Sequence, residues 1–439
     1  MNYLRWLLLF VVLTVTLVPA QAQDCPNAPA LVAALVAACP DLTRGQACFA
    51  DGARVITRSG GAVSGVLDAN DLTAFTLDGG AALVYTQANY LEVTDSQVAL
   101  LFVGDVQVTH AAASVPADLP PRAPLVVSTD GRRANVRVAP RLSAGVVTSL
   151  DDDTALVATG QTADGWLRIV TPDLQNGWIS ASLVSSDYDL SALETVAASD
   201  PLPSYPAFTP MQAFILAGSD PCGGVLALAD EGAAVLNVNG ASVELNGTAA
   251  FIRASTDALT VFALNGPAIV YADEGAQRAM PGSSIDVPLL NGSAGSPPLP
   301  PVAYDAAVVA TLSGDYAGRT LTVAAPASDE DIRLLLTTPL EGNWYVPAYS
   351  GRSTQPGCVS SMYSQAHVIY LEVADDGSSF SLMDPIAGRQ TWTRTAPGIY
   401  ESWMTFQVLS PTQITATYDA DSTPGCDMFV TMNMMWIGK

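Results

Sequence analysis

Two histidines, His110 and His367, are the only imidazoles in a chain of 439 residues. A catalytic zinc site needs several ligands at one ion, and a serine hydrolase needs a histidine beside its nucleophile. The two histidines lie far apart in the sequence, and no Gly-x-Ser-x-Gly nucleophile turn accompanies them. Paired carboxylates could still hydrolyse a glycosidic bond, but nothing marks such a pair among the 42 acidic residues. We therefore expect no enzyme activity, no metal and no cofactor.

Six cysteines offer thiol chemistry, and their even number favours disulfides. None of them belongs to a Cys-x-x-Cys pair. Cys358 and Cys426 are the only two in the last third of the chain, and both follow Pro-Gly, so we expect them to pair. The remaining four would pair among themselves, with three connectivities open: Cys25, Cys39, Cys48 and Cys222. In each connectivity, one of the first three cysteines reaches Cys222.

Residues 1–22 have the pattern of a secretory signal peptide. Arg5 precedes an apolar segment of 13 residues, Trp6 to Val18, and Ala20-Gln21-Ala22 forms a cleavage site. That segment is short against the ~20 residues that span a bilayer. We therefore expect cleavage, no transmembrane span afterwards, and a secreted or cell-envelope location in which disulfides persist.

The charge of the chain restricts its partners. Lysine and arginine number 18 against 42 acidic residues, which gives a formal net charge of −24. A surface of this sign repels nucleic acid, so we expect no nucleic-acid partner. The hydrophobic fraction of 49% is far above that of a disordered acidic chain and predicts folded domains.

Proline-rich stretches at 115–124, 201–210 and 296–301 divide the mature chain into four blocks. The first, 23–114, opens with a short helix predicted from Pro29 to Ala38 and continues as a β-domain. The third, 211–292, is a β-domain in which Asn-Gly recurs at 239–240, 246–247, 265–266 and 291–292. Asn and Gly tolerate the positive φ of type I′ turns, so we expect hairpins there. The fold class is mainly β and multidomain, with one short N-terminal helix after the signal peptide.

The first and third blocks share a strand–Gly–strand unit, around Gly104 in one and Gly266 in the other. This pattern resembles the strand repeat of FecR-type periplasmic sensor domains over about 60 residues of each block. Two unrelated small β-domains would explain it equally well.

The second block carries the most specific motif. Residues 134–184 contain Asn135-Val136-Arg137, a loop centred on Pro140, the apolar segment 155–158, and two Gly-Trp pairs at Trp166 and Trp178. This order resembles a bacterial SH3 (SH3b) domain, which we place at 122–187. The resemblance implies a small β-barrel that binds a cell-wall component or a protein, or acts as a spacer. We expect both tryptophans to fill the centre of that barrel, with contact to a ligand as the alternative.

Charge makes the second block distinctive, because it holds six arginines against seven aspartates. Three arginines near its first strand are our candidate binding residues for an anionic partner: Arg132, Arg133 and Arg141. Alternatively, these arginines only balance the acidic run Asp151-Asp152-Asp153.

The fourth block, 303–439, is predicted to be a β-barrel or sandwich, because strand patterns recur in it about every ten residues. Gly342-Asn343-Trp344 resembles the Gly-x-Trp start of a lipocalin barrel. An ordinary β-domain with its tryptophans in the core is the alternative interpretation.

The function predicted from the sequence is that of a non-catalytic exported envelope or extracellular protein, whose SH3b domain docks to a cell-wall component or an envelope protein. A small-molecule carrier with a lipocalin-like C-terminal barrel is the alternative. An accessory or cryptic wall hydrolase comes third. A filled C-terminal barrel would favour docking, and an apolar cavity within it would favour the carrier.

Overall fold

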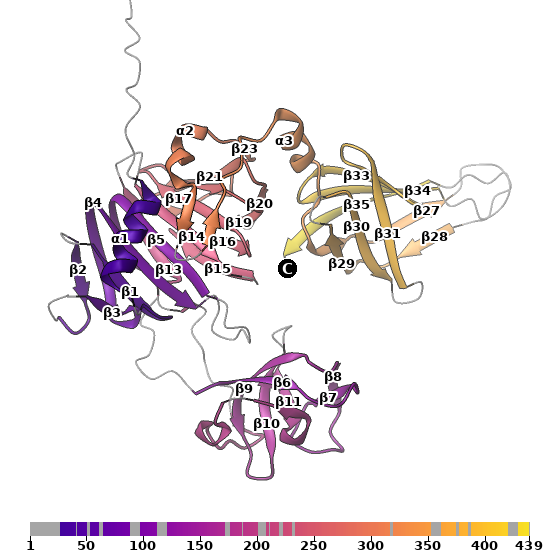
Figure 1. Cartoon of the computed structure of the whole chain (residues 1–439). Coiled ribbons are helices and arrows are strands. Elements are labelled where there is room, and N and C mark those ends of the chain that lie inside the picture. The colour runs from indigo at the N-terminus through magenta and orange to yellow at the C-terminus, as the bar shows by residue number, and fades with distance from the viewer. Residues whose placement is uncertain are drawn as a thin grey trace, which may run out of the picture.

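A computed structural model gives the fold of the chain. It describes residues 27–40, 42–50, 53–60, 65–87, 97–111, 121–171, 176–186, 188–200, 208–209, 211–218, 223–230, 233–316, 319–352, 361–374, 377–384, 388–419 and 429–438. The signal peptide predicted at 1–22 lies outside these residues. Figure 1 shows a β-sandwich, an inserted domain and a C-terminal barrel, so the predicted mainly-β, multidomain class is confirmed. No helix among the described residues is long and apolar enough to cross a membrane.

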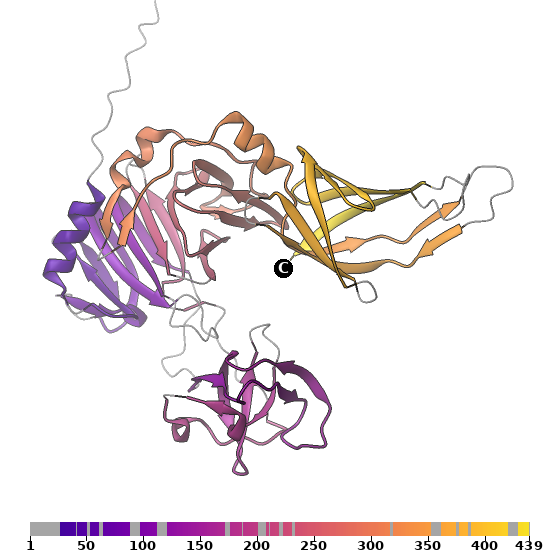
Figure 2. The ribbon, with the colours of Figure 1, turned by 45° about the vertical axis from the view of Figure 1, so that its right-hand side comes forward.

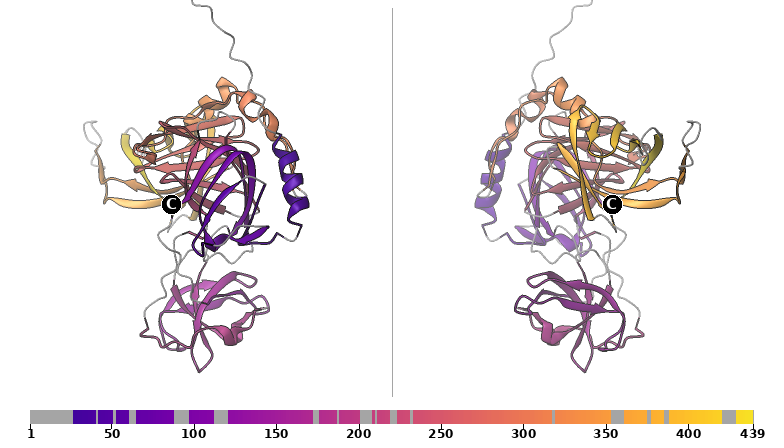
Figure 3. Two further views of the ribbon diagram at one scale, coloured as in Figure 1. Left: turned by 90° about the vertical axis from the view of Figure 1, so that its left-hand side faces the viewer. Right: turned by 90° about the vertical axis from the view of Figure 1, so that its right-hand side faces the viewer.

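The predicted N-terminal helix is present as α1 (Ala28–Ala38). Asn27 caps it by accepting a hydrogen bond from the backbone N–H of Ala30, and Pro29 lies in the first turn, where its missing N–H costs nothing. A disulfide joins Cys39, directly after the helix, to Cys48 in the first strand. The helix is thereby tied to the sandwich, and Figure 3 shows it along one flank.

The Cys39–Cys48 bond reduces the open connectivities to one. If the first four cysteines pair among themselves, it leaves Cys25 for Cys222. Both of these cysteines lie outside the described residues, as do Cys358 and Cys426. Their pairings therefore stay predictions.

The sandwich contains 16 strands in one continuous sheet. Five precede the inserted domain: β1 (Gln46–Phe49), β2 (Arg54–Thr57), β3 (Val66–Asp68), β4 (Leu72–Gln87) and β5 (Gln97–His110), with the 3-10 turn η1 (Ala69–Asp71) before β4. The other eleven follow it: β13 (Ala213–Gly218), β14 (Gly224–Ala229), β15 (Ala233–Val238), β16 (Ala241–Asn246), β17 (Ala249–Ala254), β18 (Ala258–Ala263), β19 (Ala268–Ala272), β20 (Gly275–Ala279), β21 (Ser283–Leu290), β22 (Ser293–Ala294) and β23 (Val302–Ala303).

Strand β5 joins the two sets of strands. Its first half, residues 98–103, pairs with β14, and its second half, residues 106–110, pairs with β13. Gly104 between the halves has a positive φ of 77°, and the pairing of β4 with β5 shifts register at this point. The bend divides the sheet into two layers, which enclose a core that draws residues from both sets of strands.

This pairing corrects the prediction of separate domains at 23–114 and 211–292. The two segments share one sheet and one core, and the residues between them form an insertion. The polypeptide leaves the sandwich at His110 and returns at Phe214, and these two residues face each other across β5 and β13. Proline-rich linkers marked the ends of the insertion, but the sequence could not show that its flanks belong together.

The four Asn-Gly pairs serve two purposes. Asn239-Gly240 and Asn291-Gly292 form the predicted hairpin turns, with positive φ at all four residues. The pairs at 246–247 and 265–266 instead carry the polypeptide between strands that do not pair with each other, so the hairpin prediction is wrong there. Asn265 shows a reason: its side chain accepts the N–H of Ala249 and so bonds to a different strand.

The inserted domain contains seven strands in the order β12-β6-β9-β10-β11-β7-β8. They are β6 (Ala123–Val127), β7 (Ala134–Arg137), β8 (Val146–Leu150), β9 (Ala155–Gln161), β10 (Trp166–Val170), β11 (Asn176–Ser180) and β12 (Val184–Ser185), with 3-10 turns η2 (Ala181–Leu183) and η3 (Leu190–Ala192). They surround a core of small and aliphatic side chains. In Figures 1 and 3 the domain lies apart from both the sandwich and the C-terminal barrel.

The segment after the sandwich covers one of its faces before the barrel begins. It contains α2 (Ala306–Val309), the 3-10 turn η4 (Ala310–Leu312), the hairpin β24 (Gly314–Tyr316) and β25 (Arg319–Leu321), and α3 (Asp329–Leu336). Val309, Leu312 and Tyr316 join α1 in a second core on the outer face of the sandwich. The predicted boundary at 303 therefore lies before residues that still belong to the sandwich.

Eight strands then close into a barrel, which resolves the predicted choice between barrel and sandwich. They are β26 (Gly342–Val346), β29 (His367–Val373), β30 (Ser379–Asp384), β31 (Gly388–Ala396), β32 (Ile399–Glu401), β33 (Thr405–Ser410), β34 (Gln413–Asp419) and β35 (Phe429–Gly438). Neighbours in sequence pair antiparallel, and β26 pairs with β35 to complete the circle. A ribbon of β27 (Tyr349–Arg352) and β28 (Ser361–Ser364) extends from it in Figure 2.

Candidate functional site

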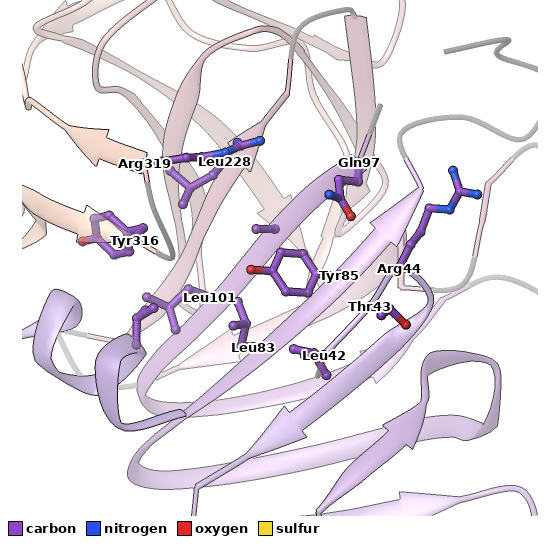
Figure 4. Close-up of a pocket in the computed structure, with 12 residues that line it drawn as sticks. Leu42, Thr43, Arg44, Leu83, Tyr85, Gln97, Leu101, Leu228, Tyr316 and Arg319 are labelled. Atoms are coloured by element: carbon purple, nitrogen blue, oxygen red, sulfur yellow. The ribbon is translucent and has the colours of Figure 1, made fainter. Parts of the chain in front are cut away.

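A pocket of about 380 Å³ lies on the outer face of the sandwich, between α1 and the β24–β25 hairpin (Figure 4). Its volume is at the lower end of the ~300–1,000 Å³ that is usual for small-molecule sites. Twelve residues from six segments line it: Val32, Leu42, Thr43, Arg44, Leu83, Tyr85, Gln97, Ala99, Leu101, Leu228, Tyr316 and Arg319.

The register of three strands explains why the surface is hollow there. Tyr85 of β4 and Leu228 of β14 lie directly opposite Ala99 of β5, one on each side. A methyl group between two long side chains leaves a depression in an otherwise filled face. Leu83 opposite Leu101 continues the row beneath it and supplies the apolar floor.

Charge at the pocket differs from that of the whole chain. Its lining contains two arginines, Arg44 and Arg319, and no acidic residue, although the chain carries 42 acids. Arg319 forms an ion pair with Asp230 and donates to the carbonyl oxygen of Ala229, 3.4 Å away. Asp230 is not part of this lining and lies in a neighbouring pocket beyond Arg319. The pocket therefore presents guanidinium groups without a carboxylate of its own.

The two tyrosines of the pocket differ in their hydrogen bonding. The hydroxyl of Tyr316 donates to the carbonyl oxygen of Leu312 at 2.6 Å, and burial raises the pKa of this tyrosine. Burial also raises the pKa of Tyr85, while the nearby positive charge of Arg319 acts in the opposite direction. Among the described residues, the Tyr85 hydroxyl has no hydrogen-bond partner. It remains protonated at neutral pH and is available as a donor.

The lining of the pocket combines hydrogen-bond donors with apolar groups. Its lining offers hydroxyl, amide and guanidinium donors above an apolar floor. It contains no carboxylate, imidazole or thiol that could act as a general base or a nucleophile at neutral pH.

The three candidate arginines of the inserted domain are not brought together. Arg132 and Arg133 precede β7, and Arg141 lies in the loop after it, so about 13 Å of extended strand separates the two positions. Arg133 pairs with Asp151 at 2.8 Å, as expected if the arginines balance the acidic run. Among the described residues, the guanidinium groups of Arg132 and Arg141 have no partner. They are exposed at opposite ends of the strand.

The loop that carries Arg141 also exposes apolar side chains. Val138, Leu142 and Val146 are 64%, 77% and 49% exposed. A Cβ built on Gly145 would lie 3.8 Å from Val138, so the two arms of the loop touch. Exposed apolar groups beside a cation are common at protein interaction surfaces.

The two tryptophans of the inserted domain are buried, but they do not fill its centre, so that prediction is wrong. Trp166 and Trp178 form a separate cluster with Val196, on the outer side of the sheet. Val196 belongs to a segment beyond the last strand, and its N–H donates to Gln161 in β9. A closely curved small sheet has room for aliphatic groups inside, and its largest rings are covered from outside.

Aromatic rings do fill the C-terminal barrel. Phe380 lies 5.7 Å from Trp392, 4.9 Å from Tyr400 and 5.1 Å from Phe406, measured between ring centroids. Trp344 is fully buried, and its indole N–H donates to the carbonyl oxygen of Leu340. The rings occupy the place at which a lipocalin-like carrier would hold its ligand.

The histidines are in different units of the fold. His110 ends β5 of the sandwich, and His367 begins β29 of the barrel. His367 is exposed, and its Nδ1 lies 2.8 Å from the carbonyl oxygen of Gln365. The described part of the chain contains no group of three or more potential metal ligands.

The family model of the bacterial SH3 domain matches residues 132–185. The inserted domain is a bacterial SH3 domain. The match confirms the resemblance noted at 134–184 and ends before Val196, so the segment that covers the tryptophans lies outside it. No curated protein and no solved structure matches the chain.

Sequence reasoning missed the pocket on the sandwich. Two of its hydrogen-bond donors, Tyr85 and Arg319, are separated by more than 200 residues and by the entire bacterial SH3 domain. The uninterrupted apolar run at residues 98–103 of β5 could predict that both faces of this half of the strand are buried. No local pattern could predict which later segment would cover one of them.

Proposed function

We propose that the chain is a non-catalytic exported protein that docks, through its bacterial SH3 domain, to a cell-wall component or an envelope protein. The match to the bacterial SH3 domain carries this proposal, because domains of this class bind cell-wall components or proteins. The Cys39–Cys48 disulfide supports an extracytoplasmic location, since such bonds persist in oxidising compartments.

The place of the domain in the fold supports docking. Because it is inserted between β5 and β13, two linkers attach it to the sandwich, and Figure 1 shows it projecting from the rest of the molecule. A projecting domain can contact a large surface while the sandwich and the barrel stay away from it. The filled C-terminal barrel also favours docking over a carrier that would use the barrel centre.

Arginine replacement in the full chain tests the proposal. We expect Arg132→Gln, Arg133→Gln and Arg141→Gln together to weaken cosedimentation with purified bacterial cell walls several-fold at low salt. Acidic wall groups attract this region, whereas a chain of net charge −24 is otherwise repelled. About 0.5 M salt should weaken binding by the wild type in the same way, because it screens exposed charges.

Single variants sharpen this test. Arg141→Gln and Leu142→Ser should each have a larger effect than Arg133→Gln, because the Arg133 charge is already paired with Asp151. Arg54→Gln on the sandwich, where Arg54 pairs with Asp78, is the matched control. Circular dichroism checks folding. Equal wall binding by the wild type and the triple variant would leave the domain as a spacer and reject the proposal.

A further inference from the structure

We propose that the pocket between α1 and the β24–β25 hairpin binds a small amphipathic carboxylate, with one carboxylate group on a compact apolar body. This site is independent of docking by the bacterial SH3 domain. It requires neither that domain nor the C-terminal barrel. Its residues come from the sandwich and from the segment that covers it.

The leucine floor of the pocket indicates that part of the ligand is apolar. Figure 4 places three leucines on one side of the Tyr85 ring: Leu42, Leu83 and Leu101. Leu83 is 3% exposed and Leu101 is fully buried, so the floor is held by packing against the second core of the sandwich. An apolar group placed on this floor would be removed from water on several sides.

The donors on the opposite side of the pocket indicate that the ligand carries a carboxylate group. In Figure 4, Arg319 and Gln97 lie across the Tyr85 ring from the leucine floor. Arg319 uses one N–H for Ala229 and another for Asp230, and a guanidinium carries five N–H donors. Its planar group can therefore keep both bonds and still donate to a carboxylate. The Tyr85 hydroxyl supplies a further donor.

The charge of the lining and the volume of the pocket limit which ligands can bind. A cation would meet two guanidinium groups and no carboxylate in the lining itself, so we expect it to bind more weakly than an anion. A neutral alcohol would find the same floor, but it would accept fewer of the N–H donors that Arg319 keeps beside its bonds to Asp230 and Ala229. At about 380 Å³ the pocket admits a short alkyl or aryl acid rather than a long-chain lipid.

Calorimetric titration of the full chain tests this inference with defined probes. Octanoate and 4-phenylbutyrate represent alkyl and aromatic acids, while octanol and octyltrimethylammonium carry neutral and cationic head groups. We expect one or both acids to bind, octanol to bind at least tenfold more weakly, and the cation to bind more weakly than the acids. The stronger of the two acids identifies the apolar body.

Two variants separate the floor from the polar side. Arg319→Gln should weaken octanoate about tenfold and leave octanol unchanged, because only the acid uses the charge. Ala99→Leu should abolish binding of both, because the added side chain fills the depression between Tyr85 and Leu228. If Arg319→Gln disturbs the β24–β25 hairpin, Arg44→Gln is the second variant, because it removes the other positive charge of the lining and lies outside the hairpin.

Arg54→Gln is the charge-matched control, because Arg54 lies on β2 and is absent from the pocket lining. It should bind octanoate as the wild type does. The inference is overturned if neither acid binds at millimolar concentration or if octanol binds as tightly as octanoate. Undiminished binding by Ala99→Leu also overturns it.

Discussion

The bacterial SH3 domain and the C-terminal barrel are both small, strongly curved β-structures, and they fill their interiors differently. Among the described residues, the apolar core of the SH3 domain consists of alanine and aliphatic side chains, and its two buried tryptophans lie outside that core. The eight-stranded barrel encloses Phe380, Trp392, Tyr400 and Phe406. Interior width grows with strand number, so the eight-stranded barrel has room for rings that the smaller sheet excludes.

The same residue type therefore has different meanings in the two units. In the barrel, a buried ring fills the centre. In the SH3 domain, Trp166 and Trp178 mark an outer face that Val196 covers. Gly160 makes that cover possible, because a Cβ at this position would lie only 2.8 Å from a Val196 methyl carbon.

The largest loss of stability is expected for a substitution at the centre of the C-terminal barrel. Phe380 is 1% exposed and contacts three other rings, so Phe380→Ala should destabilise the barrel by about 3–5 kcal/mol. Amide exchange of β29 to β35 in the full chain is the appropriate measurement, since a multidomain chain does not unfold in one step. Exchange within the SH3 domain should stay unchanged and serves as the internal control. Protection lost equally in both units would contradict the assignment of separate cores.

A second prediction tests the size limit in the SH3 domain. Leu156 is fully buried at its centre, so Leu156→Phe should overpack the core and cost about 1–3 kcal/mol. Amide exchange of β6, β9 and β10 measures this loss. A variant as stable as the wild type would show that the centre has space for a ring and would remove the basis of the comparison.

The comparison also shows what the sequence could and could not predict. Gly-Trp pairs and strand spacing predicted the bacterial SH3 domain, because a short domain is encoded in contiguous residues. The union of 23–114 with 211–292 was missed because β5 pairs with β13 and β14 across an insertion. The position of the tryptophans was missed for a related reason. Val196, which buries them, lies beyond the recognisable motif.

The candidate sites also divide into those formed by residues close in the sequence and those formed by distant segments. The arginines near β7 were found because they are close in the sequence, but an extended strand separates Arg132 from Arg141. The pocket on the sandwich depends on register and on a covering segment from the other side of the insertion, and neither is encoded locally. Helix α3 was within reach, because Ser328 and Asp331 form a capping box that is visible in the sequence.

A third prediction concerns the cover over the tryptophans. Val196→Ala removes two methyl groups from the cluster with Trp166 and Trp178 and should cost about 1–2 kcal/mol of local stability. Tryptophan emission should shift to longer wavelength as water reaches the rings. Val138→Ala, at a position that is 64% exposed, is the matched control and should change neither quantity. An unshifted spectrum for Val196→Ala would mean that Val196 does not shield the rings.

The smallest effect is expected from a carboxylate in a turn of the SH3 domain. Asp152 accepts backbone N–H bonds from Thr129 at 2.7 Å and from Gly131 at 2.6 Å, and these bonds hold the pKa of Asp152 below its usual value. A lowered pKa in the folded state means that the ionised form stabilises the domain above the unfolded pKa of about 3.9. This contribution is lost as the pH falls through the lower folded value.

Thermal unfolding of the wild type and of Asp152→Asn between pH 6 and pH 2.5 measures that contribution. The variant should be slightly less stable at pH 6, and the difference should shrink below about pH 4, as the wild-type carboxylate takes up its proton. Asp164→Asn, at another exposed turn of the same domain, is the matched control. The difference should be confined to melting of the SH3 domain, because Thr129 and Gly131 belong to it. A pH-dependent difference in the barrel would show that the two units are coupled, and their cores could then not be compared independently.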